Sequence, residues 1–401
     1  MRLAVIGSNK GVTTANAVLT EVFTGLRPNE VLILAEEQSP TPNGLAKALW
    51  YLGIKAKLSV TILGGPSTWK ENVSKVDTDV LDVTPGRKYM ALFSSNYSKS
   101  KEVRYVYLKR EVEGYRTFGY VPFQEVEVWE LREGRKLSYN PPDTEGNLPN
   151  QSLLKVDSLR GLYNILTLRG KVDYDYDNHN TNNPDQWREV CSIRAGAKRF
   201  RQEDKIQELA RQGHYFLADT NVYINLGPRV RELTKGKILA SKSVYRELTE
   251  KIKTTQKGID MKFHVGMGTF REIHRAPPVG EGRGGDISLL EETKRLKTEL
   301  SEPLTLLTSD NMVSQSGKAY GVDALYLNGF EKGEANHGEL LYCLAANGEV
   351  RVSVDDQEVV KLNMGQVVDR ITRVQSLNPK INYGPLLQEL ENLIGRESVE
   401  T

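Results

Sequence analysis

The chain has 401 residues, of which 39% are hydrophobic and 26% are charged, so it is long enough for two or three domains that each bury a core. The 54 Lys and Arg residues nearly balance the 52 Asp and Glu residues, and with a net charge of only +2 any binding to nucleic acid needs a local basic surface. No run of about 18 uncharged apolar residues and no signal-peptide pattern occurs, which predicts a soluble, cytoplasmic protein with no membrane partner.

Residues 1–135 alternate between apolar strand patterns and amphipathic helix patterns. "RLAVIG", "EVLILAE" and "AKLSVTIL" read as strands, each followed by helical spacing of apolar residues. This alternation predicts a Rossmann-like parallel sheet built from βαβ units. After Lys101 the period of two predicts an antiparallel appendage with a turn at 112–115.

Two loops of this region follow predicted strands, "GSNKGVTT" (7–14) and "DVTPGRK" (82–88). Ligands of such sheets bind at the carboxyl ends of the strands. Glycine, hydroxyl groups and a cation ahead of a helix suit phosphate, although neither the dinucleotide fingerprint nor the Walker A spacing is present. The alternative is that the glycines only permit tight turns, while Thr13 and Thr84 cap helices.

This first region resembles the CRISPR-associated Rossmann fold sensors known as CARF domains. The resemblance implies a homodimer that binds a cyclic oligoadenylate, with cyclic tetra-adenylate favoured. Where the family often has Thr-Gly-Gly, this chain has Thr84-Pro85-Gly86, and Pro85 offers no backbone N–H to a phosphate. The matching ligand-binding positions are Ser8, Asn9, Lys10, Gly11, Thr13, Thr84, Pro85, Gly86, Arg87 and Lys88.

Residues 136–212 are predicted to be a linker and helical region. One long helix is expected across 187–212, and its basic residues either contact RNA or form a solvated face. These residues are Arg194, Lys198, Arg199 and Arg201. Cys191 and Cys343 lie far apart without Cys or His at metal-ligand spacing, so we expect two buried thiols and neither a disulfide framework nor a zinc site.

Residues 213–330 place four acids at predicted strand ends or on adjoining helices. Asp219 ends the strand in "FLADTNVYINL", Glu247 follows a short strand, Asp286 starts a helix, and Asp310 ends "PLTLLTSD". If these units wind side by side, the carboxylates meet at one edge of a parallel sheet. Such a cluster is costly unless a divalent cation neutralises it, and oxygen ligands favour Mg²⁺ or Mn²⁺. Singly, each acid could instead be a cap, a turn residue or a surface residue.

The segments "LADTNVYI", "SVYREL", "GDISLLEE" and "LLTSDNMV" resemble the PIN domain family of metal-dependent ribonucleases. The resemblance implies an α/β/α nuclease domain over 213–330. Asp219, Glu247, Asp286 and Asp310 would then bind Mg²⁺ or Mn²⁺. Asn221 and either Ser309 or Thr308 would hydrogen-bond these acids.

Two further expectations concern the rest of this half. His274, Arg271, Arg275 and Arg283 are expected in a loop that grips the RNA backbone. Residues 331–401 are expected to form a small β-plus-helix extension, with strands around turns at 346–349 and 355–358 and then a helix.

Together these patterns predict a cyclic-oligoadenylate-activated, metal-dependent endoribonuclease that cuts single-stranded RNA, such as tRNA loops, in CRISPR type III antiviral defence. One alternative is a constitutive PIN ribonuclease of toxin or RNA-processing type. Another is a non-catalytic regulator that only senses a ligand.

Overall fold

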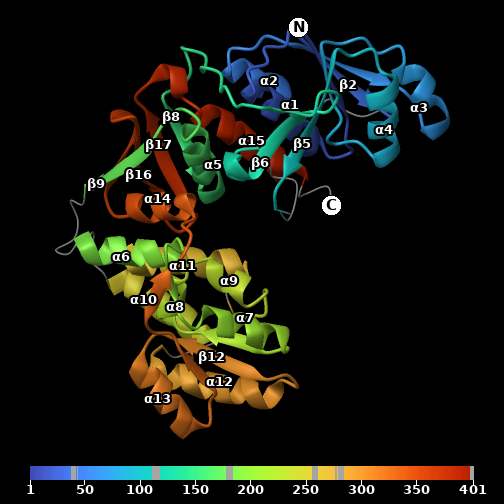
Figure 1. Ribbon diagram of the computed structural model, residues 1–401. Helices are drawn as coiled ribbons and strands as arrows, with labels where there is room; N and C mark the ends of the chain where they lie inside the picture. The colour runs from blue at the N-terminus through green and yellow to red at the C-terminus, as the bar shows by residue number, and fades with distance from the viewer. Residues whose placement is uncertain are drawn as a thin grey trace. The chain divides into compact units, whose positions relative to one another are not determined.

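The computed structural model describes residues 1–37, 42, 44–110, 118–177, 184–254, 261–275, 278 and 284–397 (Figure 1). The chain forms two compact units. The first contains residues 1–174, 351–361 and 374–401, and the second contains 175–350 and 362–373. Both contain parallel strands and helices, so the predicted α/β class is confirmed. Among the described residues, no helix has the length and apolar character needed to cross a membrane.

A seven-stranded sheet with the order β3-β2-β1-β4-β5-β6-β7 organises the first unit. The first five strands run parallel, and β6 and β7 continue the sheet antiparallel. The turn predicted at 112–115 lies outside the described residues. The strands are β1 (Arg2–Ile6), β2 (Glu30–Ala35), β3 (Lys57–Ile62), β4 (Val80–Asp82), β5 (Glu102–Leu108), β6 (Val126–Glu130) and β7 (Arg135–Leu137).

Helices cover this sheet because their apolar faces require burial. Trp69 is completely buried with Ile6 and Leu34, and its indole N–H donates to Ser94 Oγ at 3.1 Å. The C-terminal helix packs against α1, α2 and α5, so it completes the first unit from the far end of the chain. The helices are α1 (Gly11–Phe23), α2 (Leu45–Tyr51), α3 (Pro66–Val73), α4 (Lys88–Tyr97), α5 (Val156–Leu166) and α15 (Gly384–Glu397), with short 3-10 turns at Phe123–Glu125 and Pro379–Ile381.

A three-stranded parallel sheet with the order β11-β12-β13 forms the centre of the second unit. Its strands are β11 (Tyr215–Ala218), β12 (Leu304–Thr308) and β13 (Ala324–Tyr326), and every residue of β12 is buried. Two short strands flank this sheet in the sequence, β10 (Lys198–Phe200) before it and β14 (Phe330–Lys332) after it, and they pair antiparallel with each other. The helices are α6 (Pro184–Arg194), α7 (Glu203–Arg211), α8 (Thr220–Asn225), α9 (Arg229–Leu233), α10 (Lys242–Thr254), α11 (Met261–His274), α12 (Asp286–Glu299), α13 (Asn311–Tyr320) and α14 (His337–Ala345).

A further five-stranded sheet has the order β8-β17-β16-β15-β9. Its strands are β8 (Gln151–Lys155), β9 (Val172–Asp177), β15 (Glu349–Val354), β16 (Gln357–Gln366) and β17 (Ile371–Ser376). The predicted turn at 355–358 joins β15 to β16, with Asp355 and Asp356 at positive φ. The strand expected before residue 346 is wrong, because residues 337–345 form α14.

The single long helix predicted across 187–212 is also wrong. The α6 helix ends at Arg194, Gly196 adopts a φ of 84° that L side chains rarely tolerate, and the chain passes through β10 before α7 starts at Glu203. Arg194 is completely buried, so it belongs to neither the expected RNA contact nor a solvated face.

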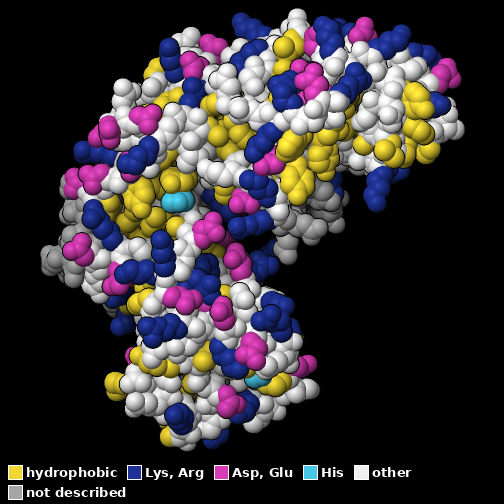
Figure 2. All heavy atoms as spheres, in the orientation of Figure 1, with side chains coloured by type: hydrophobic (Ala, Val, Ile, Leu, Met, Phe, Trp, Pro, Cys, Tyr) yellow, Lys and Arg dark blue, Asp and Glu magenta, His cyan; other side chains and the backbone are white. Residues whose placement is uncertain are grey.

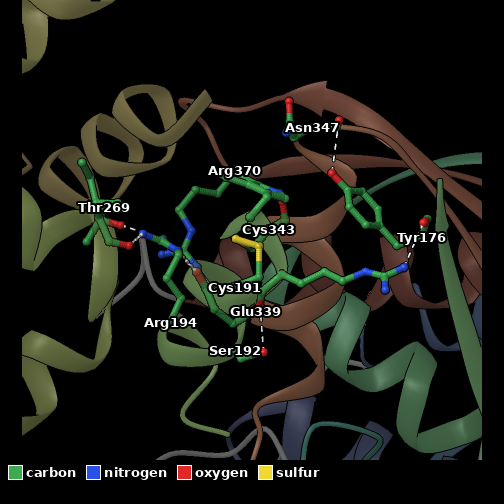
Figure 3. The surroundings of a disulfide bond; sticks show 12 residues. Tyr176, Cys191, Ser192, Arg194, Thr269, Glu339, Cys343, Asn347 and Arg370 are labelled. Carbon is green, nitrogen blue, oxygen red and sulfur yellow. Dashed lines mark hydrogen bonds and ion pairs between the residues drawn. A yellow bond between two sulfur atoms is a disulfide. The ribbon is translucent and has the colours of Figure 1, made fainter. Parts of the chain in front are cut away.

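Cys191 and Cys343 form a disulfide bond between α6 and α14, so the prediction of two thiols is wrong (Figure 3). The two cysteines are 152 residues apart, so no local spacing in the sequence indicates that they pair. The same helices are joined by the buried ion pair of Arg194 and Glu339 at 2.8 Å. Disulfides are rare in a reducing cytoplasm, so this bond bears on the predicted location, which stays a prediction.

The Arg194 guanidinium also contacts the helix that follows β11. It donates to the carbonyls of Tyr223 and Ile224 at 2.9 and 2.7 Å, near the C-terminal end of α8, and to Thr269 Oγ1 at 2.9 Å. A cation at this end of a helix interacts favourably with the helix dipole. The disulfide and the ion pair join α6 to α14, and Arg194 connects the same helices to the C-terminal end of α8.

We expect the double variant Cys191→Ser, Cys343→Ser to be less stable than wild type. The disulfide closes a loop of 152 residues and so lowers the conformational entropy of the unfolded wild-type chain. The chain-entropy relation gives an upper value of about 5 kcal/mol. Urea unfolding followed by fluorescence measures the loss. A dithiol reductant should lower the wild-type midpoint and leave the double variant unchanged, and an insensitive wild type would contradict the bond.

Candidate functional site

Asp219 lies at the carboxyl end of β11, as the sequence predicts, and precedes α8. Its N–H donates to the Leu307 carbonyl on β12 at 2.9 Å, which extends the parallel ladder by one residue. Asp219 is buried, with only 4% of its surface exposed. Carboxylates are rarely buried this far unless other groups compensate for the lost hydration. The neighbours of Asp219 therefore decide what this position can do.

Thr308 connects Asp219 to Asp310. Its hydroxyl donates to Asp219 Oδ2 at 2.9 Å and accepts from the Asp310 N–H at 3.0 Å. Asp310 caps α13, since its Oδ1 accepts from the N–H groups of Met312 and Val313 at 2.7 and 3.4 Å. Of the two hydroxyls considered from sequence, Thr308 is the one that contacts an acid. Ser309 accepts instead from Asn225 Nδ2 at 3.4 Å.

Thr220 holds the second acid, Glu247. Its hydroxyl donates to Glu247 Oε2 at 2.7 Å, and Thr220 directly follows Asp219 in the chain. Thr220 is not among the residues predicted from the sequence, although a threonine at the first position of the helix after the strand is a visible signal. Asn221 is exposed, and its expected hydrogen bond to the acids is absent from the described part of the chain.

Asp286 is the first residue of α12 and is exposed. The residue before it, Gly285, has a φ of 99°, a conformation that favours glycine. A carboxylate in the first turn also interacts favourably with the helix dipole. Its position therefore agrees with a helix-stabilising role as well as with a role in the acid cluster.

The charges of three acids act on one another. The pKa of Asp219 is raised from 3.8 to about 6, mainly by burial; the negative charges of Glu247 and Asp286 also raise it, while hydrogen bonds from Thr308 and Thr220 lower it. The two charged groups that act on Asp219 most strongly, among the residues described, are thus both acids. A carboxyl group in these surroundings keeps its proton to unusually high pH unless a cation joins it.

The donor set suits a small hard cation, because it consists of carboxylates supported by hydroxyls. As the side chains stand, no three His, Cys, Asp or Glu residues in the described ranges form a group that could hold a metal ion. The four acids therefore fit such a cation by the chemistry of their oxygen atoms. Binding would require their side chains to draw closer together.

His274 does not lie in an RNA-gripping loop, and that prediction is wrong. His274 is the last residue of α11, and Arg271 belongs to the same helix. His274 Nε2 shares a hydrogen bond of 2.7 Å with the hydroxyl of the buried Tyr223, and burial lowers the pKa of His274 to about 4. The imidazole is therefore neutral at neutral pH. Arg283 lies outside the described residues.

The two loops predicted to bind phosphate follow the adjacent strands β1 and β4 of the first unit. Gly86 packs so closely that a Cβ there would lie 2.7 Å from Ile6 Cδ1, and a Cβ on Gly7 would lie 2.8 Å from Ile33 Cγ2. A side chain at either position would therefore force its neighbours to shift. The remaining predicted ligand positions, which are Ser8, Asn9, Lys10, Gly11, Thr13, Thr84, Pro85, Arg87 and Lys88, are half-buried or exposed.

Neither threonine of these loops caps a helix, so the capping role stated for them as an alternative is wrong. The α1 and α4 helices begin after Lys10 and Arg87 without a side-chain cap. Thr84 Oγ1 accepts from the Val106 N–H at 2.8 Å. The Thr84 N–H donates to Asp82 Oδ1 at 2.7 Å. These two hydrogen bonds of Thr84 hold the start of the second loop in place.

Asp82 and Glu21 form a buried acid pair beneath the second loop, and both are completely buried. Burial raises the pKa of Glu21 well above its ordinary value, and Asp82 raises it further. The pair has its own cation, since Arg104 Nη1 lies 2.7 Å from Glu21 Oε2. Above it, Arg87 Nη1 lies 3.2 Å from Glu36 Oε2, and the Tyr89 hydroxyl also donates to Glu36.

No protein-family model matches this sequence, and no curated protein shows significant similarity to it.

The raised pKa of Asp219 predicts a specific pH dependence. Its folded-state pKa of about 6 lies above the ordinary 3.8, so the stabilisation that it contributes is fully present below pH 3.8 and is lost as the pH rises to about 6. The loss is about 3 kcal/mol. Urea unfolding of wild type and Asp219→Asn, each with a chelator from pH 4 to 8, measures it. Parallel pH profiles for the two proteins would contradict the assignment.

Proposed function

We propose that the chain is a cyclic-oligoadenylate-activated, metal-dependent endoribonuclease that joins a CARF-like sensor to a PIN-like nuclease and cuts single-stranded RNA. One observation carries the proposal. The buried Asp219 ends a parallel strand, and its strongest charged neighbours are the acids Glu247 and Asp286. An arrangement that concentrates negative charge in a buried position is costly for a purely structural role.

The residues of this chain would prepare a site for phosphodiester hydrolysis. Asp219, Glu247, Asp286 and Asp310 would hold Mg²⁺ or Mn²⁺, which when bound supplies a water of lowered pKa and neutralises charge on the phosphate. Thr308 orients the Asp219 carboxylate, and Thr220 orients that of Glu247. These hydroxyls fix the direction of the oxygens before substrate arrives, which is the role of supporting hydrogen bonds at metal sites.

The alternative route through the 2′-hydroxyl of RNA needs a histidine that exchanges protons near neutral pH. His274 hydrogen-bonds the hydroxyl of Tyr223, a residue of α8, the helix that follows Asp219. It is neutral and half-buried, with a pKa of about 4. Its state therefore favours hydrolysis supported by the acids.

The first unit would bind the activator at the two loops that follow β1 and β4. Lys10, Arg87 and Lys88 supply cations there, and an anionic ligand would compete with Glu36 for Arg87. A cyclic oligoadenylate has the symmetry of a two-fold dimer interface, so the proposal includes a homodimer. The ligand can activate the nuclease only if it binds one arrangement of that dimer more tightly than another.

The RNA-binding surface must be local. On the face shown in Figure 2, Lys and Arg side chains are interspersed with Asp and Glu over each unit, and no continuous basic surface is visible there. A mixed surface favours short contacts near the acids over long electrostatic tracking of the backbone.

The function is tested by cleavage of a mixed RNA pool with Mn²⁺, with and without cyclic tetra-adenylate. We expect Asp219→Asn to reduce cleavage by about 10³-fold or more while calorimetry shows unchanged binding of cyclic tetra-adenylate, because the substitution removes one carboxylate from the nuclease site only. Products should carry a 5′-phosphate and a 3′-hydroxyl.

Asp204→Asn, in an exposed carboxylate of α7, is the matched control and should cleave like wild type. Equal cleavage by Asp219→Asn and wild type would refute the nuclease site. Cleavage that does not respond to any cyclic oligoadenylate would favour the constitutive ribonuclease. Ligand binding without cleavage by wild type would favour the non-catalytic regulator.

A further inference from the structure

Glu292 of α12, the helix that begins with Asp286, hydrogen-bonds the start of α10, the helix that carries Glu247. Its Oε2 accepts from Ser241 Oγ at 2.8 Å and from the Ser243 N–H at 3.1 Å, and its Oε1 accepts from the Lys242 N–H at 2.9 Å. All three donors lie at the start of α10, where backbone N–H groups have no partner within the helix. Charge-assisted bonds to a helix N-terminus are among the stronger hydrogen bonds in proteins.

A second contact joins the same helices at Glu247 itself. A Cβ on Gly284, two residues before α12, would lie 3.7 Å from Glu247 Cα and 3.8 Å from its backbone nitrogen. The start of α12 therefore lies against the middle of α10, while Glu292 holds the start of α10. The two contacts fix α10 and α12 antiparallel to each other, with Glu247 and Asp286 near the second contact, at Gly284.

Glu292 is not placed to act as another cation ligand. Both of its oxygens already accept hydrogen bonds from α10. It also lies six residues after Asp286, which separates the two positions by about 9 Å along the helix axis. Its contacts act on the cluster only through the position of α10.

We propose that Glu292 is a positioning residue, which holds α10 against α12 so that Glu247 and Asp286 reach the same cation as Asp219. The inference rests on the proposed function, because it assigns Glu292 a role in assembling that cation site. Glu247 is tied to α8 through Thr220, so a shift of α10 would strain that bond or separate Glu247 from Asp286. The role of Glu292 cannot be predicted from the sequence, because Glu292 is one of several acids on α12, whose sequence is typical of an exposed helix.

The test is calorimetric titration of the full-length protein with Mn²⁺ alone, which needs no RNA and no activator. Glu292→Gln keeps the size of the side chain but turns an amide N–H₂ toward backbone N–H donors. We expect its Mn²⁺ affinity to fall about 10-fold or more. Glu291→Gln, in an exposed acid one residue earlier on α12, is the matched control and should bind like wild type.

Ser241→Ala is a milder variant that removes one of the three donors and keeps both backbone N–H bonds, although it also removes the Oγ that accepts from the Val244 N–H at 3.2 Å. We expect a smaller loss of Mn²⁺ affinity, of about 3-fold, and a modest fall of the thermal unfolding midpoint from the lost helix cap. This variant decides the question if Glu292→Gln fails to fold. High Mn²⁺ concentrations should restore the cleavage rate of either variant, and circular dichroism without Mn²⁺ must show that the variant is folded, since a bound metal also stabilises a weakened fold.

The outcomes separate the inference from the proposed function. If wild type binds Mn²⁺ and the folded variants bind it equally well, Glu292 does not position the site and the inference is overturned. If wild type binds no Mn²⁺, the proposed function fails first, and the inference falls with it.

Discussion

The second unit depends on the interaction between a buried carboxylate and the groups that surround it. Asp219 ends β11 at 4% exposure, and burial together with the charges of Glu247 and Asp286 raises its pKa. A buried aspartate ordinarily has a cation beside it. The first unit contains the contrasting case. Asp82 also ends a parallel strand and is completely buried, and burial raises its pKa too, but hydrogen bonds from Thr84 and the charge of Arg104 act in the opposite direction. Asp82 thus has a cation of the chain in its cluster, whereas the charged groups that act most strongly on Asp219 are both acids.

The surroundings of Asp219 form a set of supports that reach it from several elements. Thr308 and Thr220 direct the carboxylates, Glu292 ties α10 to α12, and Arg194 holds the C-terminal end of α8. Arg194 is in turn held by Glu339, next to the disulfide between α6 and α14 (Figure 3). Side chains that lack rotational freedom keep reactive groups in place, and this is the condition for a catalytic cluster.

The sequence predicted features that follow from periodicity and from strand ends. Parallel α/β strands, the loop after β4 and the position of Asp219 are all products of local patterns that survive in the structure. The failures involve partners that are distant in the chain. The disulfide spans 152 residues, and Arg194 looked like one of several surface cations until its partner Glu339 became visible. The helix predicted across 187–212 broke at Gly196, where a single positive φ outweighed helical spacing on both sides.

The most direct test of the central claim is a crystal structure of the protein soaked in Mn²⁺, with anomalous scattering recorded above the manganese edge. The account predicts an anomalous peak in contact with Asp219 and at least one of Glu247, Asp286 and Asp310, with the carboxylates drawn closer together than their present arrangement. An ordered site without any such peak at saturating Mn²⁺, and with the acids unmoved, would contradict it.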